Sequence, residues 1–453
     1  GGSSKVYPRY EAGPLDAIKK IVGKKVKVTY APGVVLQGDL KPIEAANWFL
    51  DAQGTKSGVM ATYFVGRDFD TKFKEVVEPT VYSDWSNNGP LQGMPNDGFS
   101  VEWNGYLKAP NSGTFAFELA SDDGSKLYLN DQLVIDNWGD HALMTKTYEM
   151  NLTAGQLYKV KVQYYENGGD AACKMGWRLP DADFVKEAVA VAKDADIVLF
   201  FGGTSEAYES EGFDRESLTL PGGQDKMLQE LFNVNKNVVV ILQSGSPVDM
   251  RGFVEKSPAI LQAFFGGMEG GNAIADVLFG KVNPSGKLPV TIPLAWEDCS
   301  AYGLYRVKDS VSVYSDGLFV GYRHFDKKNI PVQYPFGYGL SYTSFELSDL
   351  KADQKEVSVT VKNTGKTEGA EVVQLYVSDL SSTIEVPVKE LKRFKKIFLK
   401  PGESKVVTMP LDDMVFAHYD IKSHGWRKFP GNYKLSVGNS SASTPLQTTL
   451  EVK

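Results

Sequence analysis

An acidic stretch at residues 206–215 (EAYESEGFDR) carries the side chains best suited to acid–base chemistry. It follows the apolar run 197–201 and two glycines, and it precedes a segment, 227–232, with apolar residues at helical spacing. The stretch is therefore predicted to be a loop at the carboxyl end of a strand. Apolar neighbours and like charges raise the pKa of a carboxyl group, as a general acid near neutral pH requires. We therefore expect an acid on this loop to transfer protons.

The elements around this loop are predicted to form βαβ units. Residues 237–243 (NVVVILQ) and 259–265 (AILQAFF) are apolar runs that end in glycine-containing turns, and 272–279 has helical character. Near-continuous apolar strands that alternate with helices are typical of a parallel sheet covered on both faces. Ligands bind such sheets at the carboxyl ends of the strands, so three loops are expected to meet there. At the start of the chain, residues 14–28 are predicted to form a helix followed by a strand.

The acidic stretch and the segments after it resemble the second domain of glycoside hydrolase family 3, the β-glucosidase family. The resemblance rests on four segments in order: ESEGFDR (209–215), QSGSPVDM (243–250), GNAIADVLFG (271–280) and NPSGKLP (283–289). In that family a Glu on this loop is the acid/base, so the resemblance implies that role for Glu209 or Glu211. The Glu-x-x-Gly spacing favours Glu209, whereas counting back from Arg215 favours Glu211. Glu209 is slightly preferred.

A second kind of pattern begins near residues 54–58. From 59 to about 180, short alternating strands rich in aromatic and β-branched residues are separated by turn residues, which predicts an all-β sandwich or barrel. The segments GVMATYF (58–64) and SDDGSKLYLN (121–130) resemble the protective-antigen-type module. Hydrolase-like sequence resumes at 182–200, so the module is predicted to be an insertion in the α/β domain.

Two features of this predicted β module could bind ligands. Trp138, with Asp136 and His141 on a predicted loop, is the candidate substrate-binding group, although tryptophans in such modules more often belong to the core. In some lectin-like relatives the acids equivalent to Asp122 and Asp123 bind calcium. Because an Asp-Asp-Gly sequence also forms a turn by Asx hydrogen bonding, we predict no metal site.

The last part of the chain begins near residue 334. Residues 356–363, 371–378, 405–411 and 432–438 alternate with a period near two, as in an immunoglobulin-like sandwich. Residues 387–404 resemble the fibronectin type III-like domain that closes many members of the family. The basic run 389–396 is interpreted as a solvated face.

The predicted fold class is multidomain α/β plus all-β. It combines an α/β sandwich, an inserted β-sandwich module and a C-terminal immunoglobulin-like β-sandwich. The predicted boundaries are 1–56 and 181–334 for the α/β sandwich, 57–180 for the module and 335–453 for the last domain. The chain begins inside the domain that it resembles, so the resemblance implies that the catalytic barrel and its Asp nucleophile are absent from this chain. A fragment and a two-chain enzyme both fit this expectation.

Composition argues against several classes of function. A net charge of −7 offers no basic surface for nucleic acid or anionic membranes, and the apolar runs fall short of the roughly 20 residues that span a bilayer. Two cysteines, Cys173 and Cys299, can form at most one disulfide, and the four histidines lack zinc-ligand spacing. No cofactor is predicted.

The leading hypothesis is the non-barrel portion of a retaining exo-β-glycosidase, namely a β-glucosidase. Its expected partners are a β-linked gluco-oligosaccharide or glucoside and the absent barrel, and a homodimer is left open. A periplasmic or secreted location fits a polysaccharide enzyme. The alternative is a non-catalytic carbohydrate-binding or adhesion protein built on the β module. A pseudoenzyme is a third option, but it would most simply lack acids on the loop.

Overall fold

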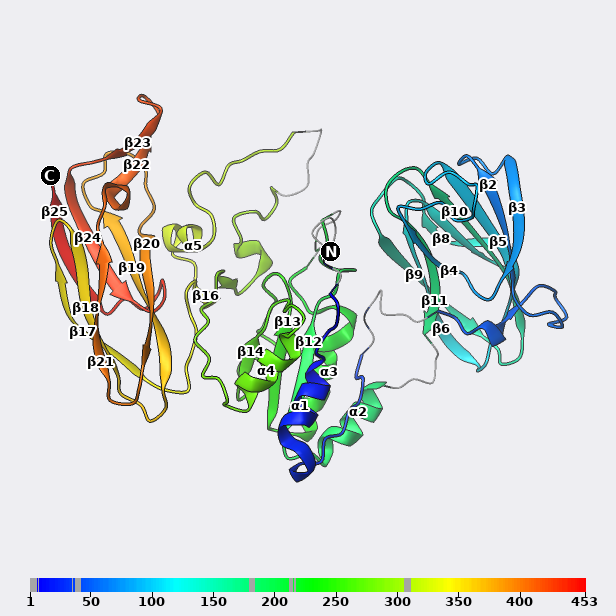
Figure 1. Cartoon of the computed structure of the whole chain (residues 1–453), viewed down its shortest axis with the longest axis horizontal. Helices are drawn as coiled ribbons and strands as arrows, with labels where there is room; N and C mark the ends of the chain where they lie inside the picture. The colour runs from blue at the N-terminus through cyan, green and yellow to red at the C-terminus, as the bar shows by residue number, and fades with distance from the viewer. Residues whose placement is uncertain are drawn as a thin grey trace.

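The computed structural model describes residues 6, 8–34, 36, 42–178, 184–211, 215, 217–304 and 311–453. Three bodies follow one another along the long axis in Figure 1: a β module, an α/β part and a second β-sandwich. No helix within the described ranges has the length and apolar character needed to cross a membrane. The predicted combination of an α/β part with β-sandwiches is confirmed.

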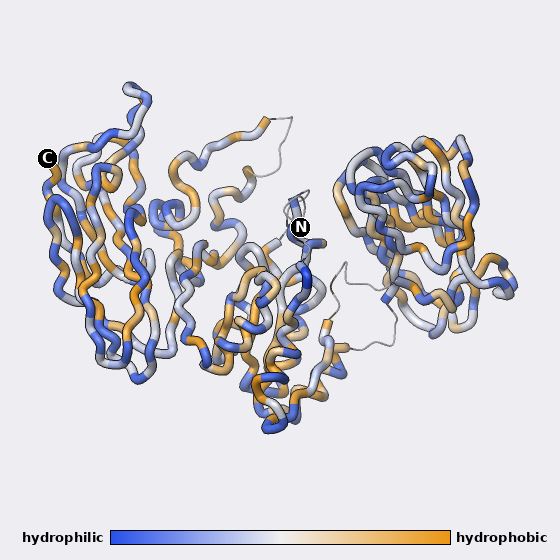
Figure 2. Tube along the Cα trace, in the orientation of Figure 1, coloured by the Kyte–Doolittle hydropathy of each residue, from blue (hydrophilic) through white to orange (hydrophobic). Residues whose placement is uncertain are grey.

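A three-stranded parallel sheet forms the centre of the α/β part. Its strands, adjacent in chain order, are β12 (Val198–Gly203), β13 (Val238–Gln243) and β14 (Ile260–Gln262). Successive residues of β12 face opposite sides of the sheet, and both sides are covered by helices. This double cover explains why the strands are almost entirely hydrophobic, as Figure 2 shows.

Helices from both ends of the α/β sequence cover this sheet. They are α1 (Pro14–Val22), α2 (Phe184–Lys193), α3 (Gln224–Val234) and α4 (Gly270–Leu278). Ile18 of α1 and Ala275 of α4 pack together against Leu199 and Phe201 of β12. Helices α2 and α3 share a second apolar cluster with Phe200. Because α1 precedes the β module and α4 follows it, two separate stretches of sequence build this sandwich.

The start of the α/β part differs from the prediction in one respect. Pro14 begins α1 and Gly23, with φ 55°, ends it, as proline and glycine commonly do. The strand predicted after this helix is wrong for the described residues: a 3₁₀ turn, η2 (Gly23–Lys25), leads into irregular chain. Val26 and Tyr30 are 55% and 65% exposed, so their apolar side chains are not packed against the sheet.

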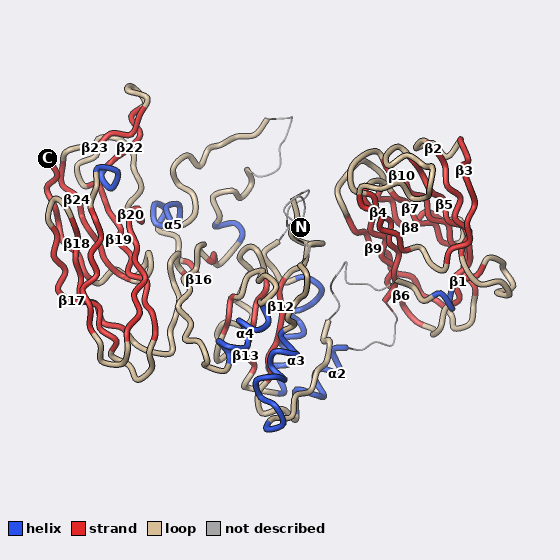
Figure 3. The backbone as a smooth tube through the Cα atoms, in the orientation of Figure 1, coloured by secondary structure: helices blue, strands red, loops and turns tan. Residues whose placement is uncertain are grey.

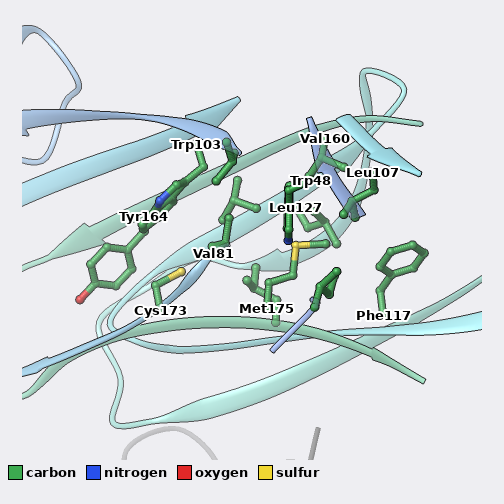
Figure 4. Packing of buried hydrophobic residues seen from close by; sticks show 14 of the residues in the cluster. Trp48, Val81, Trp103, Leu107, Phe117, Leu127, Val160, Tyr164, Cys173 and Met175 are labelled. Atoms are coloured by element: carbon green, nitrogen blue, oxygen red, sulfur yellow. The ribbon is translucent and has the colours of Figure 1, made fainter. Parts of the chain in front are cut away.

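The β module consists of two antiparallel sheets. The larger has β1 (Trp48–Phe49), β2 (Val59–Val65), β3 (Thr71–Glu78), β5 (Phe99–Lys108), β7 (Ser125–Leu129), β8 (Gln132–Asn137) and β10 (Leu157–Glu166). The smaller has β4 (Tyr82–Ser86), β6 (Gly113–Asp122), β9 (Met144–Leu152) and β11 (Ala171–Arg178). Figure 4 shows Trp48, Trp103, Cys173 and Met175 in the core of the module. A 3₁₀ turn, η3 (Ala45–Asn47), precedes β1, whose Trp48 is fully buried.

The C-terminal body is also a sandwich of two antiparallel sheets. One has β17 (Phe345–Ala352), β18 (Glu356–Asn363) and β21 (Ser404–Pro410); the other has β19 (Gly369–Asp379), β20 (Glu390–Leu399), β24 (Gly431–Gly438) and β25 (Leu446–Val452). A turn, η6 (Asp413–Phe416), and a hairpin of β22 (Ala417–Asp420) and β23 (Gly425–Lys428) complete it. Val359, Leu375 and Leu435 are fully buried between the sheets.

A connecting region joins the α/β part to the C-terminal sandwich. It contains β15 (Ile292–Pro293), η5 (Trp296–Asp298), α5 (Tyr322–Lys328) and β16 (Val332–Tyr334), and Figure 3 shows that most of it is loop. Lys287 contacts Glu371 at 2.7 Å and Arg323 contacts Glu390 at 3.0 Å, so ion pairs cross from this region to the sandwich. Residues 318–321 are loop, and α5 begins at Tyr322.

Candidate active site

The acidic loop begins where β12 ends. Gly203 has a φ of 144°, and a side chain there would collide with the Gln243 carbonyl of β13. The buried Gln224 amide bonds both the N–H and the C=O of Gly203, at 2.8 and 2.7 Å. The chain then makes one turn in which the N–H of Glu209 donates to the Ser205 carbonyl at 3.0 Å. The loop therefore starts from a rigid base at the carboxyl end of the sheet.

Glu209 joins this loop to the loop after β13. Its Oε1 accepts hydrogen bonds from Arg215 Nη1 at 2.9 Å and from the Ser246 hydroxyl. Its Oε2 accepts the Gly245 N–H at 2.6 Å. Arg215 Nη1 also donates to Ser246 Oγ at 2.9 Å and to the Pro247 carbonyl at 3.0 Å. The side chains of Glu209 and Arg215 are only 12% and 13% exposed, so this ion pair is largely shielded from water.

These contacts determine the charge of Glu209. Burial alone would raise the pKa of its carboxyl group, but the bonds from Ser246 and Gly245 and the charge of Arg215 outweigh burial. The net result is a pKa held below the ordinary value. Glu209 is therefore a carboxylate at neutral pH, which corrects the expectation of a raised pKa for this residue.

The other loops at this edge are shaped by backbone geometry. A side chain on Gly245 would meet Glu209 Oε2 at 2.7 Å, so glycine allows the carboxylate to approach the backbone. At the end of β14, Phe264 has a φ of 53°, which is rare and strained for an aromatic residue. The neighbouring Phe265 is 52% exposed and contacts the position that a Gly245 side chain would occupy. Loops after all three strands thus meet, as predicted.

Glu206 and Glu211 occupy the outer part of the acidic loop. Both are exposed, in contrast to Glu209. Residues 212–214, which belong to the segment used for the family resemblance, lie outside the described residues. The two acid/base candidates therefore differ: Glu209 lies in a clamp formed by Arg215, Ser246 and Gly245, whereas Glu211 is exposed.

The binding residues predicted in the β module lie on β8 and the loop after it. Trp138 is 42% exposed; its ring stacks on Phe69 with centroids 6.3 Å apart and contacts Tyr165 edge-on at 4.7 Å. His141 has its ring nitrogens 2.9 and 3.0 Å from main-chain carbonyls. The Asp136 carboxylate accepts the Trp138 N–H at 3.2 Å. The three residues are brought together, and Lys126 Nζ also lies 4.4 Å from the centre of the Trp138 ring, so the indole is only partly exposed.

An acidic cluster lies next to this loop. Carboxylate oxygens of Asp122, Asp123 and Glu166 lie within 4.8 Å of one another, close enough for a shared cation. However, Asp123 accepts the N–H groups of His141 and Asn167, at 2.8 and 2.9 Å. Burial, with the charges of Asp123 and Asp170, raises the pKa of Asp122 to about 6. Burial also raises the pKa of Glu166 to about 7.

Two sets of contacts were not predicted from the sequence: the hydrogen bonds to Glu209 and the position of Glu166 in the acidic cluster. The bonds from Gly245 and Ser246 to Glu209 span 36 and 37 positions, and no local pattern indicates such contacts. Glu166 joins the acidic cluster because β10 pairs with β7. The available signal for the clamp was Arg215, six residues after Glu209.

Comparison with known families places the chain clearly. The model of the "Glycosyl hydrolase family 3 C-terminal domain" matches residues 1–342, which includes the acidic loop and the β module. The "Fibronectin type III-like domain" matches residues 371–441 in the last sandwich.

Relatives support the same placement. The chain is 34% identical over 480 residues to "Probable beta-glucosidase K" of Emericella nidulans, an alignment that covers 100% of this chain and 57% of that protein. It is 40% identical over 317 residues to "Thermostable beta-glucosidase B" of Acetivibrio thermocellus, covering 67% of this chain and 42% of that protein. The chain therefore spans about half the length of these relatives.

Solved structures agree with the sequence relatives. The β-glucosidase of Kluyveromyces marxianus in complex with glucose is similar over 100% of this chain and 57% of its own, with a TM-score of 0.77 and 31% identity. A β-glucosidase of Bifidobacterium adolescentis is 40% identical over 61% of this chain and 42% of its own, with a TM-score of 0.58. The chain belongs to glycosyl hydrolase family 3, of which it carries the C-terminal domain.

Proposed function

We propose that this chain is the non-barrel portion of a retaining exo-β-glycosidase. The activity of the complete enzyme is that of a β-glucosidase, which hydrolyses terminal non-reducing β-D-glucosyl residues. The observation that carries the proposal is the clamp on Glu209, which fixes an acid-bearing loop at the carboxyl edge of the sheet. The names of the relatives support the substrate class.

Within this function we assign proton transfer to Glu211 and a positioning role to Glu209. A general acid must carry a proton at the working pH, and the lowered pKa of Glu209 keeps that carboxyl group ionised. Glu211 is exposed on the same loop, two residues after Glu209. The preference for Glu209 drawn from spacing is therefore reversed.

The proposed chemistry follows the two-carboxylate scheme of retaining glycosidases. One carboxylate attacks the anomeric carbon while the other protonates the leaving oxygen and then activates water, and the two groups lie about 5–5.5 Å apart. Glu211 takes the second role. The nucleophile is an Asp of the barrel that is absent from this chain.

We also propose the domain division 1–56 and 181–334, 57–180, and 335–453, with the β module as a protective-antigen-type insertion. Packing of α1 on α4 across the module supports the insertion. The coverage of relatives also supports it, because the Bifidobacterium structure aligns with 61% of this chain and the Kluyveromyces structure with all of it.

The β module is proposed to border the substrate crevice. It is attached to the α/β part at both of its ends, which restricts its orientation, and ligand sites favour the boundaries between domains. Trp138, with Asp136 and His141, is the candidate contact for sugar units beyond the first. Such a contact narrows the crevice against long glucans.

The competing proposal is a carbohydrate-binding or adhesion protein without catalysis. Its support is the partly exposed aromatic cluster around Trp138. It gives no account of the clamped acidic loop, and the relatives are named as β-glucosidases. The glycosidase proposal accounts for both.

The decisive experiment compares this chain with the complete enzyme on an aryl β-glucoside. The folded chain alone should show no turnover, because one of the two carboxylates is missing. The complete enzyme should hydrolyse the glucoside, and Glu211→Gln should abolish most of that activity. Turnover by the isolated chain that Glu211→Gln removes, or full activity of the Glu211→Gln enzyme, would contradict the proposal.

A further inference from the structure

Gln224, the first residue of α3, reaches from the helix to the end of β12. The residue is only 1% exposed, although glutamine side chains are mostly solvated. Its Oε1 accepts the Gly203 N–H at 2.8 Å, and its Nε2 donates to the Gly203 carbonyl at 2.7 Å. Nε2 also donates to the Pro221 carbonyl at 3.0 Å. One amide group therefore connects the start of α3 to the residue at which the acidic loop leaves the sheet.

The Gln224 amide takes the place of a neighbouring strand at this point. Among the described strands, β12 is an edge strand that pairs only with β13. A carboxamide presents one acceptor and N–H donors, as a peptide unit presents one acceptor and one donor. Gln224 can therefore satisfy both main-chain groups of Gly203 at once, and no side chain that only donates or only accepts can do the same.

The two glycines at the end of β12 leave room for this amide. A Cβ atom on Gly202 would lie 2.6 Å from Gln224 Oε1 and 2.4 Å from the Phe200 ring. A Cβ atom on Gly203 would lie 1.8 Å from the Gln243 carbonyl oxygen. Because these distances are too short for any side chain, close packing of the amide against the end of the strand requires glycine at both positions. The Gly-Gly pair and Gln224 thus form one packed unit.

This unit lies close in sequence to the acids of the loop. Gly203 and Glu209 are six positions apart, and Glu211 follows two positions later. The loop is therefore anchored twice, at the Gly203 peptide by Gln224 and at the Glu209 carboxylate by the clamp. Misplacement of a reacting group by about 1 Å can lower a rate about 100-fold. A change at either anchor is thus large enough to affect catalysis by Glu211.

We propose that Gln224 is a positioning residue for proton transfer. Its amide fixes the Gly203 peptide, and through that peptide it sets where the acidic loop presents Glu211. The inference rests on the proposed function, which gives Glu211 the role of acid/base. Because Gln224 is buried, it acts through the loop and not on the substrate.

A carboxyl group at position 224 makes the need for this amide testable by pH. In Gln224→Glu, a protonated carboxyl donates through its O–H and accepts at its other oxygen, so it can replace both bonds to Gly203. An ionised carboxylate only accepts, so the bond to the Gly203 carbonyl is lost. Burial favours the protonated form. The variant should therefore hold the loop in place in acid and misplace it as the pH rises.

The measurement uses two aryl β-glucosides with the complete enzyme, one with a poor and one with an activated leaving group. Misplacement of the general acid lowers the ratio of kcat/KM for the first to kcat/KM for the second, because an activated leaving group needs little protonation. Loss of folded enzyme lowers both values equally and leaves the ratio unchanged. Relative to wild type, Gln224→Glu should keep the ratio within about twofold at about pH 5 and lower it about tenfold at about pH 8.

Two further variants separate the hydrogen bonds from other effects of substitution. Gln224→Met keeps the length of the side chain but has no donor, so it should lower the ratio about tenfold at both pH values. Gln229→Glu is the matched control, because Gln229 lies on the same helix and its amide also donates to a main-chain carbonyl, that of Gly252 at 2.7 Å. Since Gly252 lies outside the acidic loop, this variant should keep the wild-type ratio at both pH values.

Two results would overturn the inference. One is a wild-type ratio in Gln224→Met, and the other is an equal loss in Gln224→Glu at both pH values. Failure of the proposed function gives a different pattern, in which Glu211→Ala keeps the wild-type ratio. If Glu211→Ala lowers the ratio and Gln224→Met does not, the acid/base assignment stands and the positioning role of Gln224 is wrong.

Discussion

Glu209 in the α/β part and Glu166 in the β module are both shielded acids, yet their surroundings act in opposite directions. The Glu209 carboxylate accepts hydrogen bonds from an Arg guanidinium, a hydroxyl and a main-chain N–H, and its pKa is lowered. Glu166 lies beside Asp122 and Asp123, and its pKa is raised to about 7. Both groups are desolvated, so the neighbours decide which protonation state each keeps.

This difference separates two kinds of acid in the molecule. The acidic loop is held in place by a carboxylate whose pKa is lowered, so in the proposed mechanism the proton-carrying role falls to another residue of that loop. The β module contains the acids that hold protons near neutral pH, although it lies outside the proposed catalytic pair. A shifted pKa is therefore a guide to function only together with position.

The largest effect is expected from Glu211→Ala in the complete enzyme. Turnover of glucosides with poor leaving groups should fall by roughly two to four orders of magnitude, because the general acid is lost. Activated aryl glucosides should lose much less in the glycosylation step. Glu206→Ala, another exposed acid on the same loop, is the control and should stay near the wild-type rate. Steady-state kinetics on both substrates measure this, and equal losses in the two variants would refute the assignment.

The second effect concerns the clamp. Glu209→Gln should lower the free energy of unfolding of the α/β part by about 1.5–3 kcal/mol, because charge-assisted hydrogen bonds to a shielded carboxylate are lost. Turnover should fall by about tenfold through misplacement of the loop.

The sign of the pH dependence distinguishes the clamp from an acid. Because the folded pKa of Glu209 lies below its ordinary 4.5, its stabilisation is present above that value and is lost as the pH falls through the folded pKa. Wild type should therefore lose stability in acid more steeply than Glu209→Gln, as chemical denaturation at several pH values would show. An altered acidic or basic limb of the pH–rate profile in Glu209→Gln would argue against a purely positioning role.

A third, smaller effect of opposite sign is expected for the β module. The pKa values of Asp122 and Glu166 are raised to about 6 and 7 from 3.8 and 4.5, so stability is full below about pH 4 and falls as the pH rises through 6 to 7. Glu166→Gln should raise the melting temperature of the module by about 2–4 °C at pH 8 and change it little at pH 4.

Calorimetry at the two pH values measures this shift. Glu149→Gln is the control, because this side chain is 67% exposed. Its melting temperature should stay unchanged at both pH values. A melting temperature of Glu166→Gln that is unchanged at pH 8 would show that the cluster does not bear the expected charge repulsion.

The smallest effect is expected from Trp138→Ala. If its loop narrows the crevice, the relative kcat/KM for a tetrasaccharide over a disaccharide should rise about two- to threefold, because removal of the indole relieves part of the steric restriction. Trp426→Ala, another exposed tryptophan, should leave the ratio unchanged. Replacing residues 58–180 with a Gly/Ser bridge should raise this kcat/KM ratio more than Trp138→Ala does. A folded deletion variant with the wild-type chain-length preference would reject the role of the module.

The fold could be predicted from the sequence where hydrophobic periodicity and turn residues agree. The near-continuous apolar run 237–243 became β13 (Val238–Gln243), and the alternating run 356–363 became β18, because the first pattern suits a strand covered on both faces and the second a strand covered on one. The predicted strand after α1 failed, since local apolar residues do not show whether a sheet has a partner to pair with them. Only residues 260–262 of the strand predicted at 259–265 form β14, because the backbone of Phe264 is not extended.

The site could be predicted only in part, and for a physical reason. The position of the acidic loop followed from strand and helix order, which is local information. The protonation state of Glu209 depends on hydrogen bonds from Ser246 and Gly245. These residues reach the carboxylate only when β12 and β13 pair in parallel. Sequence spacing thus located the acids, whereas long-range contacts distinguish the clamp from the acid/base candidate.

Azide rescue in the complete enzyme tests the central assignment most directly. With an activated aryl β-glucoside, Glu211→Ala should accumulate the glycosyl-enzyme, because the base that activates water is missing. Added azide needs no base, so it should restore turnover and yield β-glucosyl azide in Glu211→Ala but not in Glu209→Ala. Rescue confined to Glu209→Ala, or absent from both variants, would contradict the assignment of proton transfer to Glu211 and of positioning to Glu209.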